Sequence, residues 1–207
     1  MAIYKNLKQA LSDIQNATTL KLKVTTKELP HDLFSLSNID SLYIQSETLC
    51  NIQTDIEKLG QLRTLYISSP VLEKIPQSIF NIKTLETLNL ASCKIKLFEL
   101  EAGKSYQIVN LLLNKNKLKE IPANLEHLES LQTLSLSDNE LEEFDTKLLN
   151  LINLKSLSYD RNKLVDLPCH KIKQLQQLKQ ISLDGNLFSD TKKEEIQQEL
   201  NYWFGEL

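Results

Sequence analysis

The sequence repeats itself about every 23 residues, and this period constrains the fold more than any other feature. Segments of the form LxxLxL begin at residues 62, 85, 108, 131, 154 and 178, and weaker copies begin at residues 17 and 39. The steps between the eight starts are therefore 22, 23, 23, 23, 23, 23 and 24 residues. A nearly constant period of this length is typical of a solenoid, in which each repeat stacks on its neighbours.

Within each copy, apolar residues alternate with others, which is the periodicity of a strand. The fourth and sixth positions, such as Leu134 and Leu136, are expected to point to one side of a short strand. One copy cannot bury these side chains, but stacked copies can, and their strands then form a single parallel sheet. The alternative, a set of amphipathic helices, predicts apolar spacings of three and four throughout, and the copies lack them.

The ninth position of the last four copies is asparagine. The chain bends there, and an amide side chain can both donate to and accept from backbone groups that would otherwise be buried unpaired. We therefore expect a ladder of structural amides, and irregular bonding in the first three copies, which carry Thr25, Glu47 and Pro70 instead. The asparagines are Asn116, Asn139, Asn162 and Asn186.

The pattern LxxLxLxxNxL, followed by an Ile-Pro or Leu-Pro pair, resembles the leucine-rich-repeat family in its 23-residue form. The resemblance covers residues 17–188, and the pairs stand at 75–76, 121–122 and 167–168. In style the chain is similar to compact intracellular bacterial members. The resemblance implies an α/β fold, a curved horseshoe with the parallel sheet on its concave face, and a role in binding proteins. The cysteine at position 93, in the ninth place of its copy, fits the family alternative to asparagine.

We expect one domain over residues 1–207, with a capping helix at each end of eight repeats at 17–188. Apolar residues at Ile3, Leu7, Leu11 and Ile14 predict an amphipathic helix within residues 1–16. A second helix is expected over residues 189–207. Its capping box is Thr191 to Glu194, and its apolar face is Ile196, Leu200, Trp203 and Phe204. The segment after residue 95 departs from the repeat, so we expect a bulge with a turn at its glycine, residue 103.

Strand positions that alternate with the core leucines are expected to face the concave side. Among them, Tyr43 and Tyr66 should lie on neighbouring strands about 4.8 Å apart, and Leu112 is an apolar residue on a face that meets water. Tyrosine anchors with a polar surround are the usual composition of a binding patch. For the acidic members the alternative of ordinary solvated residues is favoured. The partner-binding candidates are Tyr43, Tyr66, Asn89, Leu112, Asn114, Asp138, Asp160, Arg161 and Asp184.

Composition and motifs exclude several other functions. The net charge of −3 offers no basic excess for nucleic acid, and no apolar run is long enough to span a membrane. None of His31, His127 and His170 aligns with a concave serine or cysteine, and Walker, GxGxxG and HExxH motifs are absent. We therefore predict no enzyme activity, no cofactor and no metal.

Three widely spaced cysteines argue against a disulfide framework and favour a reducing, cytoplasmic setting. The expected function is a monomeric adaptor that binds one protein or peptide. Two alternatives stay open from the sequence. One is a secreted or surface bacterial effector that acts on host proteins, and the other is the recognition part of a longer enzyme.

Overall fold

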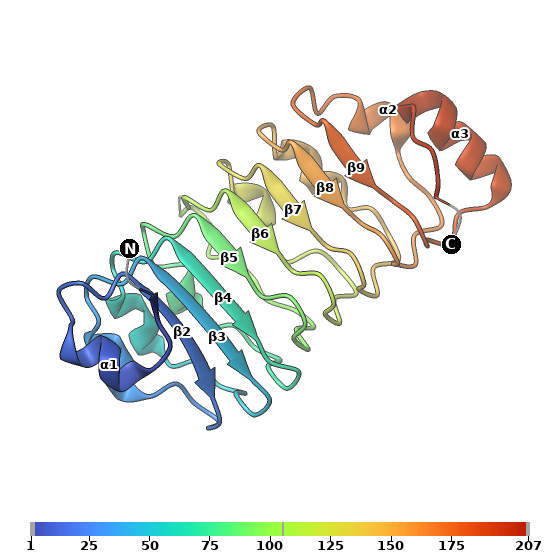
Figure 1. Ribbon diagram of the computed structural model, residues 1–207. Coiled ribbons are helices and arrows are strands. Elements are labelled where there is room, and N and C mark those ends of the chain that lie inside the picture. Colours follow the sequence, from blue (N-terminus) through green and yellow to red (C-terminus); the bar gives the residue numbers. More distant parts are fainter. Residues whose placement is uncertain (1–2, 105, 206–207) are drawn as a thin grey trace.

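Short strands form where the repeats alternate leucine with other residues, and the strands pair in chain order into one parallel sheet (Figure 1). The computed structural model describes residues 3–104 and 106–205, and within these residues the sheet has nine strands. The parallel solenoid predicted from the period is therefore confirmed. The strands are β1 (Ile3–Tyr4), β2 (Thr19–Val24), β3 (Ser41–Ser46), β4 (Thr64–Ser68), β5 (Thr87–Asn89), β6 (Asn110–Leu112), β7 (Thr133–Ser135), β8 (Ser156–Ser158) and β9 (Gln180–Ser182).

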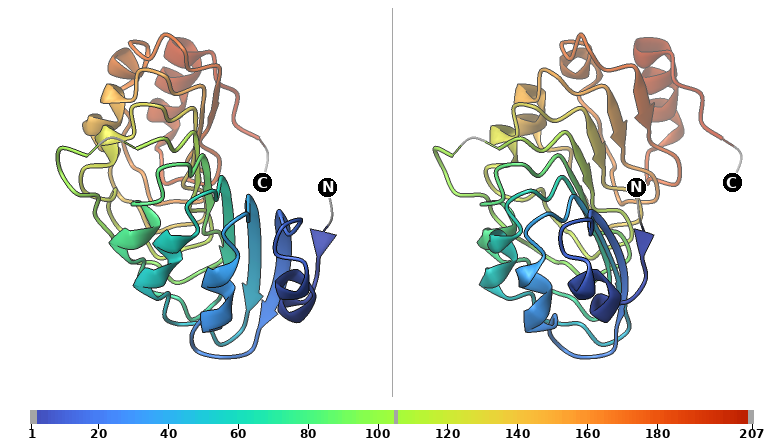
Figure 2. Two further views of the ribbon diagram at one scale, coloured as in Figure 1. Left: turned by 90° about the vertical axis from the view of Figure 1, so that its left-hand side faces the viewer. Right: turned by 60° about the vertical axis from the view of Figure 1, so that its left-hand side comes forward.

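The chain returns from each strand along the other side of the solenoid, where short helices form. Figure 2 shows them on the side opposite the open face of the sheet, which lines the concave surface. They are five 3₁₀ helices and one short α-helix in the part of the chain that the structure describes. Their bounds are η1 (His31–Ser35), η2 (Thr54–Lys58), η3 (Gln77–Ile79), η4 (Leu125–His127), η5 (Thr146–Asn150) and α2 (Cys169–Ile172).

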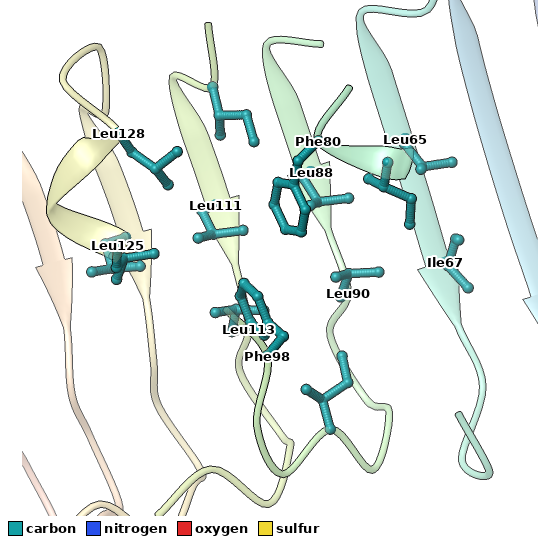
Figure 3. Packing of buried hydrophobic residues seen from close by; sticks show 14 of the residues in the cluster. Leu65, Ile67, Phe80, Leu88, Leu90, Phe98, Leu111, Leu113, Leu125 and Leu128 are labelled. Carbon is teal, nitrogen blue, oxygen red and sulfur yellow. The ribbon is translucent and has the colours of Figure 1, made fainter. Parts of the chain in front are cut away.

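The core lies between the sheet and the returning segments (Figure 3). Side chains at the fourth and sixth positions, such as Leu65, Ile67, Leu88 and Leu90, point into it and are fully buried. Burying one such side chain stabilises the fold by about 2 kcal/mol. Equivalent positions in the other repeats add further apolar or aromatic side chains, so the core is continuous along the stack.

The predicted asparagine ladder is present. Asn139 accepts the N–H of Leu118 on Oδ1 at 3.1 Å, and its Nδ2 donates to the carbonyl oxygens of Leu113 and Leu136 at 2.9 Å each. These bonds join the turns of adjacent repeats. Asn116, Asn162 and Asn186 make the same set of bonds in their own repeats.

Buried hydroxyl groups replace the amides in the early repeats. Ser46 Oγ accepts the backbone N–H of Leu49 at 2.8 Å, and Ser69 Oγ donates to the Leu49 carbonyl oxygen at 2.7 Å. Both serines are buried. A hydroxyl is shorter and has one donor, so it cannot reproduce the amide's bonds to two carbonyl oxygens, and the two serines bond differently from each other. The irregular bonding expected here is therefore observed.

The repeat after residue 95 packs aromatic rings where other repeats have a helix. Phe98 is buried and stacks on Phe80 at 5.6 Å between ring centroids, and Tyr106 meets Phe80 edge-on at 6.2 Å. Gly103 has a φ of 75°, which forms the expected turn. Leu97 stays exposed beside this cluster.

At the N-terminus the predicted helix is shorter than expected. Ile3 and Tyr4 form β1, which pairs with the edge of β2, and α1 (Leu7–Ser12) begins only after Asn6. The cause is local: Asn6 is extended and its side chain accepts the N–H of Lys8, so it acts as the N-cap. The prediction that residue 3 lies on a helical face was wrong, because the open edge of β2 offers unpaired backbone groups.

At the C-terminus, α3 spans Asp190–Leu200 and packs on α2. Its N-cap is Ser189, whose side chain accepts the N–H of Lys192, so the predicted capping box was placed two residues late. The helix ends at Asn201, which is left-handed. Trp203 therefore lies beyond the helix and is 74% exposed, which contradicts its predicted place on the apolar helical face.

Candidate functional site

The concave surface is built by one row of side chains that follows the register of the sheet. Tyr43 of β3 lies opposite Tyr66 of β4, and their ring centroids are 6.2 Å apart with an angle of 35° between the rings. Both side chains are half-buried. Among the described residues, neither phenol oxygen has a hydrogen-bond partner. The two rings thus present a single apolar surface with free hydroxyl groups.

These two tyrosines line a hollow with a volume of about 480 Å³ on the open face of the sheet. Lys21 of β2 is in register with Tyr43, and its Nζ lies 5.4 Å from the centre of that ring. A cation over an aromatic face is attracted by the ring quadrupole. The lining residues are Lys5, Lys21, Leu22, Lys23, Tyr43, Ile44, Gln45 and Tyr66.

The three lysines of the hollow were not among the residues selected from the sequence. Lys21 and Lys23 occupy concave positions of the repeat, but the sequence analysis did not select them. Lys5 could not be placed, because it follows the unexpected strand β1, whose pairing brings it beside β2. The usable signal was the alternation Lys-Leu-Lys at residues 21–23, which puts two charges on one face of a strand.

The middle of the row is less polar and carries no free charge. Asn89 lies opposite Tyr66, and its Oδ1 accepts the N–H of Ala91 at 2.9 Å. Leu112 follows between Asn89 and Ser135 and is half-buried. Asn89 and Leu112 therefore extend the tyrosine surface by two strands. Asn114, half-buried just after β6, lies at the edge of this region.

At the far end of the row, Asp160 is engaged by groups of its own chain. Its carboxylate accepts from the hydroxyl groups of Ser137 (3.3 Å) and Ser182, and from the N–H of Asp184 (3.0 Å). Hydrogen bonds to a charged group of this kind are stronger than those between neutral groups. Asp160 therefore joins three adjacent repeats.

Asp138 and Arg161 form an ion pair in the turns that follow β7 and β8. The guanidinium donates from Nε at 2.6 Å and from Nη2 at 2.7 Å, and this bonding lowers the pKa of Asp138 below its usual value. Both residues have positive φ, of 57° and 50°, as expected for the turn position they share. Each charge of this partly exposed pair therefore has its partner within the chain.

Asp184 is held by the segment that follows α3. Tyr202 donates its hydroxyl to Asp184 Oδ1 at 2.9 Å, and the N–H of Gly205 donates to the same oxygen at 3.1 Å. Burial raises the pKa of Tyr202 to about 12, so its hydroxyl remains a donor at neutral pH. The acidic candidates Asp138, Asp160 and Asp184 are thus all bonded within the chain, unlike the tyrosines.

A larger hollow, of about 620 Å³, lies between two successive returning segments, residues 73–77 and 96–101. Exposed Leu97 forms part of it. The charges around it are mostly paired, because Lys96 bonds Glu73 at 3.4 Å and Lys104 bonds Glu101 at 2.5 Å. We therefore favour the smaller tyrosine hollow, where cations lie beside aromatic rings without acidic partners.

The described residues show few features of a catalytic or metal-binding site. No group of three or more metal-ligating side chains is found among them. Cys93 and Cys169 are buried, and burial raises the pKa of both thiols, which disfavours the reactive thiolate. In the same residues, His127 Nδ1 is buried and has no hydrogen-bond partner, so nothing orients it as a base.

None of the helices in the described part of the chain has the length and apolar character needed to cross a membrane.

The 23-residue period, the parallel sheet and the asparagine ladder define a leucine-rich-repeat fold, and solved structures agree. An internalin from Listeria monocytogenes, InlF, superimposes with a TM-score of 0.64 over 87% of this chain at 26% identity. Internalin C2 from the same species gives a TM-score of 0.68 at 27% identity, covering 87% of this chain and 76% of that one. No protein-family model matches the sequence, and no curated protein matches it.

A plant protein shares the fold at lower identity. The ectodomain of the receptor kinase GASSHO1/SCHENGEN3 from Arabidopsis thaliana, solved in complex with CASPARIAN STRIP INTEGRITY FACTOR 2, has a TM-score of 0.72 at 22% identity. The match covers 90% of this chain and 23% of that one. This chain also spans only 52% of the internalin InlF, so it corresponds to about half of that protein.

Proposed function

We propose that this chain is a non-enzymatic binding module that holds a protein or peptide on the concave face of its sheet. The observation that carries the proposal is the pair Tyr43 and Tyr66, half-buried side by side in a hollow and free of hydrogen-bond partners among the described residues. Tyrosine is enriched where single residues dominate binding energy, since it combines a large apolar area with a hydroxyl. Leu112 and Asn89 continue the surface along the row.

The size of the sheet limits the contact. Nine strands at about 4.8 Å span roughly 38 Å, and three to four residues per strand give a width of about 10–13 Å. This strip is on the order of 500 Å², whereas a standard interface takes about 800 Å² from each partner. A partner must therefore also touch the turns at the strand ends, or bind with modest affinity. Asn114, in the turn that follows β6, lies where such contacts would fall.

The test is a quantitative pull-down from a lysate of the source organism. The variant Tyr43→Ala/Tyr66→Ala/Leu112→Ser removes the proposed anchors, and Ser135→Ala/Ser158→Ala changes the same row on β7 and β8, beyond these anchors. Circular dichroism checks that each variant keeps the fold. The proposal requires a protein that the wild type and the serine variant capture and the tyrosine variant loses. Equal capture by all three would refute the concave site.

We also propose that the module works as a monomer in a reducing, cytoplasmic setting. The support is that all three cysteines are free, with Cys93 and Cys169 buried. Sedimentation at increasing concentration tests the monomer, and fractionation of source cells with an antibody tests the location. Recovery from the medium would favour the alternative of an exported effector.

A further inference from the structure

The tyrosine hollow carries a positive charge that the rest of the chain does not balance. Lys5, Lys21 and Lys23 line it, and no carboxylate does. Within residues 3–104 and 106–205, none of these three ammonium groups takes part in a salt bridge. The whole chain has a net charge of −3, so this is a local excess on an acidic protein.

Some other lysines of the structure pair with carboxylates. Lys96 pairs with Glu73 and Lys117 with Glu140, in both cases across adjacent repeats, and Lys173 pairs with Glu199 of α3. At the opposite end of the concave face, the carboxylates are also satisfied by neighbours of their own chain. At the third, fifth and seventh positions of the repeats, which face the concave side, the lysines are Lys21 and Lys23, and both adjoin the two half-buried rings.

The geometry keeps these cations available to a ligand. Lys21 Nζ rests over the Tyr43 ring, 5.4 Å from its centroid, and makes no hydrogen bond or salt bridge among the described residues. Like charges on adjacent strands repel each other, so an anion between them relieves the repulsion as it binds. Gln45 adds an amide to the same wall, which can donate to a carboxylate.

We propose that the hollow binds an acidic peptide segment of the partner, with one or two carboxylates on the lysines and an apolar side chain on the tyrosines. This inference rests on the proposed function and names the chemistry of its partner. Charge complementarity carries it, since a patch of one sign selects and steers a segment of the other. A polynucleotide fits less well, because its regular phosphate charges would extend onto the acidic remainder of the face.

The experiment selects ligands without assuming a partner. A random peptide library displayed on phage is panned against the wild-type chain and against Lys21→Glu/Lys23→Glu. Control chains are Lys171→Glu, an exposed lysine of α2 on the other side of the sheet, and Tyr43→Ala/Tyr66→Ala. The affinity of the best wild-type peptide is then measured for every chain, with single-stranded oligothymidylate as a second anionic probe.

The wild type and Lys171→Glu are expected to enrich peptides with aspartate or glutamate beside an apolar residue. The variant Lys21→Glu/Lys23→Glu should bind the best wild-type peptide at least roughly tenfold more weakly. Panning against this variant should enrich peptides with lysine or arginine instead. Peptides lost with the tyrosine variant but without acidic enrichment would overturn this inference and leave the proposed function intact. Selection of peptides that bind the tyrosine variant as tightly as the wild type, or of no peptides at all, would overturn both this inference and the proposed function. Equal or tighter binding of oligothymidylate would overturn the peptide assignment.

Discussion

The two halves of the sheet use their polar side chains differently. From β6 to β9, amides and carboxylates are bonded to adjacent repeats, as in Asn139 and Asp160. From β2 to β4, the strands are longer, the asparagines are missing, and Tyr43, Tyr66 and Lys21 face solvent without such bonds. The comparison teaches that a regular repeat uses its polar groups for its own stability. In the irregular half, some polar side chains have no partner within the chain and can contact a binding partner.

The largest expected difference between the halves is in stability. Asn139→Ala removes a buried amide and leaves the N–H of Leu118 and two carbonyl groups short of partners, so it should lower the free energy of unfolding by about 3 kcal/mol. Ser69→Ala removes one buried bond and should cost about 1 kcal/mol. Urea unfolding measures both. Equal losses would contradict the contrast between the halves.

The next effect is on binding, and it should fall in the opposite half. Tyr66→Ala should weaken a captured peptide or protein by roughly 30-fold, equivalent to about 2 kcal/mol, while stability changes little. Ser158→Ala, in the same row on β8, should leave the affinity within about twofold. Isothermal titration calorimetry gives both dissociation constants. A larger loss from the serine change would place the site at the other end.

A smaller effect on stability should appear in the regular half of the sheet, where the residue at one core position differs from its equivalents in the neighbouring repeats. Tyr159 stands where neighbouring repeats have Leu136 and Leu183, and its buried hydroxyl has no partner among the described residues. Burial also raises the pKa of this group. Tyr159→Phe should therefore stabilise the chain by about 1 kcal/mol, read from the thermal midpoint. A destabilisation of similar size would show that the hydroxyl is bonded in solution.

The smallest effect concerns pH. The ion pair lowers the pKa of Asp138 in the folded state, so its stabilisation is present above the unfolded pKa of about 4 and is lost as the pH falls through the folded value. Because the pair is partly exposed, Arg161→Gln should cost only about 0.5 kcal/mol near neutral pH. The difference should shrink on acidification. Lys21→Gln, which breaks no ion pair, should show no such pH-dependent difference in urea midpoints.

Periodicity alone predicted strands β2 to β9, the core and the asparagine ladder. These depend on contacts between a residue and its equivalents about 23 positions away, so one aligned repeat describes them all. Leu134 is buried for the same reason as Leu88, and Asn116 bonds as Asn162 does. The tyrosine pair could also be placed side by side, since register follows from the constant step.

What the sequence could not reveal depends on contacts outside the repeat. Lys5 reaches the hollow only because β1 pairs with β2, and a strand of two residues has no period to detect. Asp184 is satisfied by Tyr202 and Gly205, which arrive from beyond the last repeat. The candidate list therefore mixed free residues with bonded ones.

The central claim is that the half with tyrosines and lysines binds, and the half with aspartates does not. Backbone chemical shifts recorded by NMR during titration with the best selected peptide test this most directly. The account predicts perturbations that cluster on β2–β5 and reach residue 112 at most, with β7–β9 unchanged. A cluster on β7–β9, around Asp160 and Asp184, would contradict it.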